Sequence, residues 1–130
     1  MTAALEGASV SLNQQVANVV VQEHKRLLGR GPKKAQAFYR RNVVVVLMED
    51  ALTEAERRLA ASGEPDVVLQ MRQRYQELMR PALLEAILGL TGCHVEAFMS
   101  ANHISPDVAA EVFVLDRPIA AEPAQARETG

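Results

Sequence analysis

The run Val43-Val44-Val45-Val46-Leu47 is the strongest strand signal in this chain of 130 residues. Four consecutive β-branched residues favour an extended backbone over a helix. Side chains alternate between the two faces of a strand, so this run is apolar on both faces. Two explanations remain open: a central strand that the chain itself covers on both sides, or a strand with one face covered by a second subunit.

The remaining segments predict an α+β domain around this strand, because the apolar spacing changes between helical and alternating. Helical spacing predicts helices over 10–28, 53–61 and 65–90, and strand patterns are found over 33–39, 42–49, 94–101 and 108–115. We expect the order α-ββ-α-α-ββ. Two β-hairpins would form an antiparallel sheet, packed against a leader helix, a short helix and a long helix that Pro81 kinks or divides.

The helix ends carry recognisable signals. Gly29 and the following Pro32 are expected to end the leader helix, and Thr53 with Glu56 has the spacing of a capping box. Pro65 is expected in the first turn of the long helix. The apolar stripe of that helix is assigned to Val68, Met71, Tyr75, Leu78, Leu83, Ile87 and Leu90.

Length and composition predict one globular domain at residues 9–116, between a flexible leader at 1–8 and a disordered tail at 117–130. Cys93 is the only cysteine, so no intrachain disulfide can form, which fits a reducing cytoplasm. The longest apolar run, Val43 to Met48, is far shorter than the roughly 20 residues of a membrane-spanning helix. We therefore expect a cytoplasmic protein without membrane insertion.

Positive charge is concentrated in residues 25–41, which hold 7 of the 14 basic residues and no acid. The other 7 basic residues accompany all 16 acids, so the rest of the chain has a net charge of −9. A basic surface on an acidic body attracts anions or acidic partners. The residues assigned to this anion- or partner-binding surface are Arg30, Lys33, Lys34, Arg40 and Arg41.

The turn Gly29–Lys34 is the sharpest local motif within this segment, since glycines allow backbone amides to approach an anion. It lacks the spacing of a nucleotide-binding loop and follows a helix, whose C-terminal end disfavours anions. A capped helix end with a solvated basic turn is the simpler interpretation. Phe38 and Tyr39 lie among the basic residues, as aromatic platforms do in nucleic-acid modules, but only one of the two can face outward from a strand.

No other motif predicts catalysis or a cofactor. His24, Cys93, His94 and His103 lack the spacings of a zinc site, and Ser100 and Ser105 lack a nucleophile-elbow pattern. His103 is the histidine expected to be exposed. We therefore predict no metal, no cofactor and no enzymatic activity. The methionines Met71, Met79 and Met99, together with the 43–46 run, are considered as a second adhesive surface that would favour a homo-oligomer, with a dimer preferred.

Several motifs together resemble a bacterial family, the MpsC-like domains, named for the third component of a Na⁺-translocating, membrane-potential-generating system. The resemblance covers about residues 10–116. Its segments are Gly29-Arg30-Gly31-Pro32, the 43–47 run, Leu52-Thr53-Glu54-Ala55-Glu56-Arg57, Met71-Arg72, Arg80-Pro81 and Leu90-Thr91-Gly92. The chain departs from the family pattern at 99–106, where the family tends to have His-Thr-Asp and a Ser/Thr-rich turn, and at 35–39.

The resemblance implies a small cytoplasmic protein linked to a membrane system for cation translocation and inorganic-carbon supply, and it supplies no catalytic residues. We expect a non-enzymatic accessory or regulatory domain that docks on a membrane-transport subunit through its basic surface. The alternative is an anion- or nucleic-acid-binding module that uses residues 25–41. The net charge of −2 and the absence of a known nucleic-acid motif argue against nucleic acid as the partner.

Overall fold

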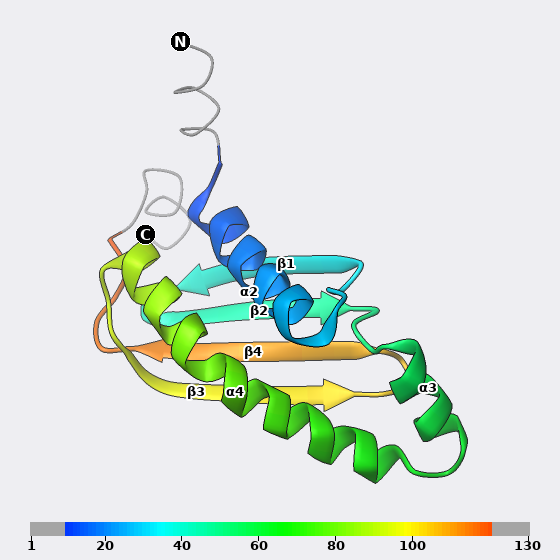
Figure 1. Ribbon diagram of the computed structural model, residues 1–130. Coiled ribbons are helices and arrows are strands. Elements are labelled where there is room, and N and C mark those ends of the chain that lie inside the picture. The colour runs from blue at the N-terminus through cyan, green and yellow to red at the C-terminus, as the bar shows by residue number, and fades with distance from the viewer. Residues whose placement is uncertain (1–9, 121–130) are drawn as a thin grey trace.

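The computed structural model describes residues 10–120 as one four-stranded antiparallel sheet with helices on one face (Figure 1). The strand order is β1-β2-β4-β3, so the two hairpins meet at β2 and β4. The elements are α2 (Leu12–Leu28), β1 (Lys34–Arg40), β2 (Val43–Glu49), α3 (Glu54–Ala61), α4 (Pro65–Thr91), β3 (Val95–His103) and β4 (Val108–Leu115). The predicted order α-ββ-α-α-ββ and the α+β class are confirmed.

Local signals set the helix ends. The Ser11 hydroxyl accepts a hydrogen bond from the Gln14 amide at the start of α2, and Gly29 ends this helix with a φ of 84°. That left-handed conformation favours glycine. Thr53 and Glu56 form the predicted capping box of α3. Pro65 occupies the first turn of α4, and this helix continues through Pro81 to Thr91, which excludes a division into two helices.

The register of the sheet gives every strand one face toward the helices. Val44, Val46 and Met48 of β2 face inward, as do Phe113 and Leu115 of β4, and all five are at most 1% exposed. They pack against α2 and α4 and form most of the core. The core is therefore built from aliphatic residues and Phe113 without tryptophan.

A β-bulge in β3 changes the predicted face of one residue. Val95 pairs with Leu115, whereas Ala97 pairs with the next residue back along β4, Val114. Val95 therefore packs on the core, while Ala97 and Met99 face the other side of the sheet. Strict alternation would place Val95 on the same face as Ala97 and Met99, but an extra residue in the bulge shifts the alternation.

The core-facing stripe of α4 also differs from the prediction. Leu78 is 63% exposed, while Arg72 and Gln76 are buried. The buried positions are Val68, Arg72, Gln76, Met79, Leu83 and Ile87. The apolar residues at 71, 75 and 78 follow a neighbouring stripe of the same helix, and the polar partners of Arg72 allow it to take an inner position.

The chain after β4 packs against the domain farther than predicted. Ile119 is 8% exposed, and its amide donates a hydrogen bond to the Arg41 carbonyl. Ile119, within the predicted tail, thus packs against the domain. The rest of that tail, 121–130, and the predicted leader at 1–8 lie outside the described residues.

The second face of the sheet has no covering element within residues 10–120 (Figure 1). On this open face lie Val43, Val45 and Leu47 of β2, next to Val112 and Val114 of β4. Within residues 10–120, the chain covers the 43–47 run on one face only, so the first of the two explanations does not hold for the described residues. One layer of helices can cover only one face of a sheet, so this apolar face remains open.

Candidate functional site

The basic turn lies at one end of the sheet, against the loop between β2 and α3. The Arg30 guanidinium donates to the carbonyl oxygens of Asp50 and Leu52, at 2.9 and 2.5 Å. Its side chain is 33% exposed and also lies 3.7 Å from the Asp50 carboxylate. Arg30 therefore joins the turn between α2 and β1 to the loop between β2 and α3.

Two carboxylates organise the charges at this end. Asp50 lies 3.3 Å from the Lys33 ammonium and forms an ion pair with Arg57, which also lies 3.4 Å from Asp107. The Asp107 carboxylate accepts hydrogen bonds from the backbone amides of Ala51 and Leu52, at 3.1 and 3.0 Å. Charged hydrogen bonds of this kind stabilise loop structure. No sequence motif marks Asp50 or Asp107 for these roles.

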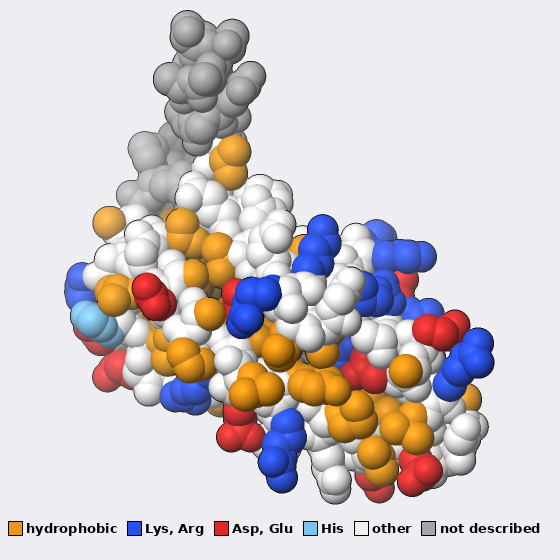
Figure 2. All heavy atoms as spheres, viewed as in Figure 1, with side chains coloured by type: hydrophobic (Ala, Val, Ile, Leu, Met, Phe, Trp, Pro, Cys, Tyr) orange, Lys and Arg blue, Asp and Glu red, His pale blue; other side chains and the backbone are white. Residues whose placement is uncertain are grey.

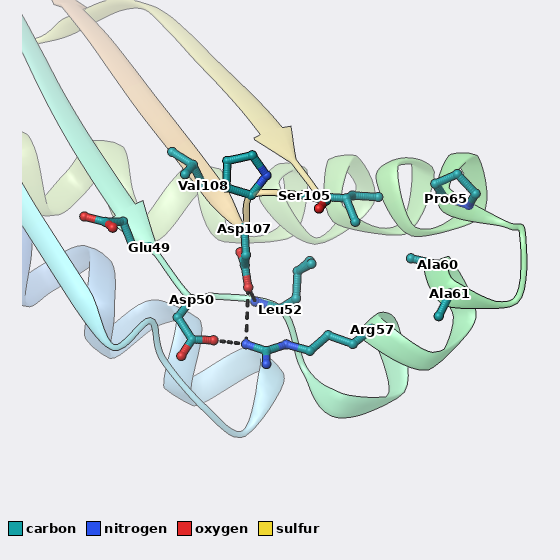
Figure 3. Close-up of a pocket in the computed structure, with 12 residues that line it drawn as sticks. Glu49, Asp50, Leu52, Arg57, Ala60, Ala61, Pro65, Ser105, Asp107 and Val108 are labelled. Atoms are coloured by element: carbon teal, nitrogen blue, oxygen red, sulfur yellow. Dashed lines mark hydrogen bonds and ion pairs between the residues drawn. The ribbon is translucent and has the colours of Figure 1, made fainter.

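A shallow pocket of about 700 Å³ opens beside these charges (Figure 3). The Arg57 side chain reaches from α3 toward Asp50 and Asp107, while Ala60, Ala61 and Pro65 form a small apolar wall. Because its guanidinium is already engaged by two carboxylates, Arg57 offers little to an incoming anion. The pocket thus combines an ion-paired rim with a plain apolar wall and lacks an evident reactive group among the described residues that line it.

The five predicted site residues do not gather at one point. Arg30 and Lys33 lie at the end of the sheet that holds Asp50 and Asp107, which we call the charged end. Lys34 and Arg40 lie at opposite ends of β1, about 20 Å apart at the rise of an extended strand. Arg41 lies in the turn after β1, with a φ of 56°. An extended backbone spreads sequence neighbours apart, so these cations form a basic edge along β1.

The cations of this edge differ in how they are engaged. Lys34, Arg40 and Arg41 are exposed and have no ion pair within residues 10–120, while Lys33 shares Asp50 with Arg30 and Arg57. The first three therefore remain available to a partner. We use the name basic edge for Lys33, Lys34, Arg40 and Arg41.

The two aromatic residues of β1 divide as predicted. Phe38 is 49% exposed on the open face of the sheet, between Lys34 and Arg40 on the same side of the strand. Tyr39 is partly buried and packs on the core. The three methionines do not form one surface, because Met79 is fully buried in the core and Met99 is 52% exposed on the open face.

An internal group of polar residues escaped the sequence interpretation. Arg72 makes a bidentate ion pair with Glu56, in which its Nε and Nη2 donate to the two carboxylate oxygens at 2.8 and 2.6 Å. Its Nη2 also donates to the Ala51 carbonyl at 2.6 Å. Both side chains are at most 3% exposed. Arg72 thus ties α4 to α3 and to the loop that Arg30 and Asp107 hold. The one signal in the sequence was the position of Arg72 four residues after Val68, on the same helix face.

Two buried titratable groups have shifted pKa values. Glu111 on β4 is fully buried, and burial raises its pKa to about 7, although the Ser100 hydroxyl donates to its carboxylate at 2.6 Å and Arg72 acts in the opposite direction. Burial also lowers the pKa of His24. Burial disfavours the charged form of a group, so it raises the pKa of an acid such as Glu111 and lowers the pKa of a base such as His24. His103 is exposed, as predicted, with its Nδ1 at 2.7 Å from the Pro106 carbonyl.

We expect substitution of Arg30 to loosen the charged end. Arg30→Ala leaves two backbone carbonyls without their charged donor, so the free energy of unfolding should fall by about 1–2 kcal/mol. Chemical denaturation measures the change. Arg40→Ala is the matched control, because Arg40 is exposed and no ion pair of this side chain is present among the described residues; an equal loss in both variants would contradict the role of Arg30.

Neither a metal centre nor a membrane span is evident in the described part of the chain. Within residues 10–120, no three His, Cys, Asp or Glu side chains are grouped so that they could hold a metal ion. None of the described helices is long and apolar enough to cross a membrane.

Comparison with known proteins gives one match. Residues 9–117 match the sequence model of a family described as Na⁺-translocating membrane potential-generating system (MpsC). No curated protein and no solved structure matches the chain. The match spans the whole sheet, all three described helices and the charged end. The chain therefore belongs to the MpsC family.

Proposed function

We propose that this chain is a non-enzymatic, cytoplasmic accessory or regulatory protein of the membrane system that gives its family its name. It acts as a homodimer and docks on a cytoplasmic acidic segment of a membrane subunit. The family description supports the link to a Na⁺-translocating membrane system. The single cysteine, Cys93, which is free and buried, agrees with a reducing compartment.

The observation that carries this proposal is the basic edge on an otherwise acidic chain. Lys34, Arg40 and Arg41 are exposed and have no ion pair among the described residues. Exposed charges of one sign steer an oppositely charged partner and fix its orientation. The acidic partner segment would lie along β1, because the cations follow this strand. Arg30 would hold the turn before β1 in place through its hydrogen bonds to the Asp50 and Leu52 carbonyls.

A non-enzymatic role agrees with the state of the candidate nucleophiles. Cys93 is 2% exposed, and the Ser100 hydroxyl donates to the buried carboxylate of Glu111. Ser105 lies on the pocket wall, where Arg57 is the nearest cationic group among the lining residues and is engaged by carboxylates. A nucleophile needs a base within hydrogen-bond reach, and within residues 10–120 the Ser105 hydroxyl makes no hydrogen bond to any of the carboxylates that line the pocket.

Charge reversal on β1 tests the docking. We expect Lys34→Glu with Arg40→Glu to reduce co-purification with a membrane subunit of this system by about tenfold or more, because attraction becomes repulsion. Both proteins are co-expressed, and the membrane subunit is quantified in the eluate from tagged chain. The matched control reverses Arg58 and Arg74, two exposed helix residues, with the same change in net charge. Equal losses in both double variants would contradict a specific basic edge.

One observation favours a second candidate function, an anion- or nucleic-acid-binding module. Phe38 is exposed between Lys34 and Arg40 on one side of β1, which combines a stacking surface with phosphate-binding charge. Fluorescence titration with short DNA and RNA at two salt concentrations tests it. Binding that weakens steeply with salt and is lost in Phe38→Ala would support this function. Absence of binding at low salt would remove it.

A further inference from the structure

The open face of the sheet is an ordered grid of side chains. The strand register places them in four rows across β1, β2, β4 and β3. From the charged end, the rows are Lys34-Glu49-Val108-His103, Gln36-Leu47-Ala110-Ala101, Phe38-Val45-Val112-Met99 and Arg40-Val43-Val114-Ala97. Charged side chains occupy only the corners and one end row, so the centre of this face is entirely apolar.

The third row contains the two exposed large hydrophobic side chains of this face. Phe38 on β1 is 49% exposed and Met99 on β3 is 52% exposed, and they stand at opposite edges of the sheet. Val45 and Val112 lie between them. When this row faces its own reversed copy, the large side chains at the two edges stand opposite each other, and the valines stand opposite each other between them.

We propose that the open face packs against the same face of a second copy of this chain, with the Phe38 side chain against the partner subunit's Met99. This inference deepens the homodimer of the proposed function by naming its interface. Sheets that pack face to face lie about 10 Å apart, with strand directions within about 30° of each other. Contact between a methionine sulfur and an aromatic ring adds to the burial of apolar surface.

Charge selects one of the two symmetric arrangements. A twofold axis parallel to the strands places β1 over the partner's β3, so that Phe38 meets the partner subunit's Met99 and Lys34 meets the partner subunit's His103. An axis across the strands would place β1 over the partner's β1 with the ends exchanged. Lys34 would then face the partner subunit's Arg40 twice in each dimer, and like charges in such positions are unfavourable.

The size of the face agrees with a dimer in exchange with monomers. Four strands about 4.8 Å apart and about seven residues long give a face of about 19 by 23 Å, before the relief of the side chains is added. Stable interfaces of standard size bury about 800 Å² on each partner, and weaker ones bury less. This face lies toward the smaller class, so we expect dimer dissociation in the micromolar range.

Paired substitutions test this interface by light scattering at tens of micromolar protein. Wild type should be dimeric, and Phe38→Glu or Met99→Lys should each weaken dimerisation by about tenfold or more, since each places an unpaired charge in an apolar contact. The two together should restore the dimer, because glutamate at 38 then meets the partner's lysine at 99. Within one chain these positions lie on opposite edges, too far apart to pair.

Leu78→Glu is the control, since Leu78 is 63% exposed on α4 and lies away from the open face. This variant should dimerise as wild type does. A monomeric wild type, or single variants that dimerise like wild type, would overturn the interface. Failure of the double variant to recover, with circular dichroism unchanged, would overturn the arrangement with Phe38 opposite Met99. Failure of docking is a separate outcome, because docking is measured by co-purification of the membrane subunit, whereas the interface is measured by the mass of the purified chain.

Discussion

Replacement of Arg72 by methionine should lower the free energy of unfolding by about 3–5 kcal/mol, the usual cost of leaving a buried charge without its partner. Arg72 and Glu56 are at most 3% exposed, and two hydrogen bonds of 2.8 and 2.6 Å join them. The variant also removes the donor to the Ala51 carbonyl. Chemical denaturation of the purified variant, compared with wild type, measures the loss.

A second substitution separates the charge effect from lost packing. Glutamine at position 56 keeps the capping box but removes the charge, so Glu56→Gln combined with Arg72→Met should be more stable than Arg72→Met alone. The double-mutant cycle gives the coupling energy of the pair. A loss below about 1 kcal/mol for Arg72→Met would mean that water reaches Glu56 and that the pair is not a buried one.

The second large effect is a change in how stability depends on pH, produced by Glu111→Gln. Burial raises the folded-state pKa of Glu111 from 4.5 to about 7, so the folded state holds its proton more tightly than the unfolded chain does. The stability from this group is therefore complete below pH 4.5 and is lost as pH rises through 7. A shift of this size corresponds to about 3 kcal/mol, so the variant should be more stable than wild type above neutral pH by up to that amount.

His24 has the opposite effect and partly hides that of Glu111 in wild type. Burial lowers the pKa of His24 below its ordinary value of 6.5, so its stability contribution is lost as pH falls through and below 6.5. The two slopes oppose each other between 4.5 and 6.5. In Glu111→Gln the His24 slope should appear alone, as stability that rises with pH up to about that ordinary value.

Denaturation midpoints across this pH range measure both effects. Ser100 on β3 and Arg72 on α4 act on Glu111, while Glu23, Glu56 and Arg72 act on His24. Glu49→Gln is the control, because Glu49 is an exposed acid at the end of β2. A profile of Glu111→Gln parallel to that of wild type would show that Glu111 titrates normally and would contradict the shifted pKa.

Much of the fold could be predicted from the sequence, because its signals are local. Ser-, Thr- and Gly-based caps depend on a few neighbouring residues, so the ends of α2 and α3 at Gly29 and Thr53 were confirmed. The run at 43–47 specified β2 by itself. Its two apolar faces also indicated that β2 is apolar on the face of the sheet opposite the helices.

The errors arose where distant parts of the chain decide the outcome. The stripe of α4 was placed on Leu78 because an apolar pattern cannot reveal that Glu56, on another helix, will take Arg72 into the core. The bulge near Val95 depends on pairing with Leu115. Similarly, a cluster of basic residues in sequence became an extended edge, because β1 separates Lys34 from Arg40 by its length.

The segment 99–106, where the resemblance led us to expect a departure from the family pattern, extends from β3 into the turn before β4. Met99 is the first residue of this region, and it is 52% exposed in the apolar row of the open face. Residues 104–107 form the turn before β4, where Asp107 holds the backbone amides of Ala51 and Leu52. Residues 99–107 thus contribute to the proposed dimer interface through Met99 and to the charged end through Asp107.

The most direct test of the account measures binding of the purified chain to the membrane subunit in detergent, at low and at high salt. An acidic segment on the basic edge requires binding at low salt that weakens steeply as salt screens the exposed charges. No binding at low salt, or binding that salt leaves unchanged, would contradict docking through Lys34, Arg40 and Arg41.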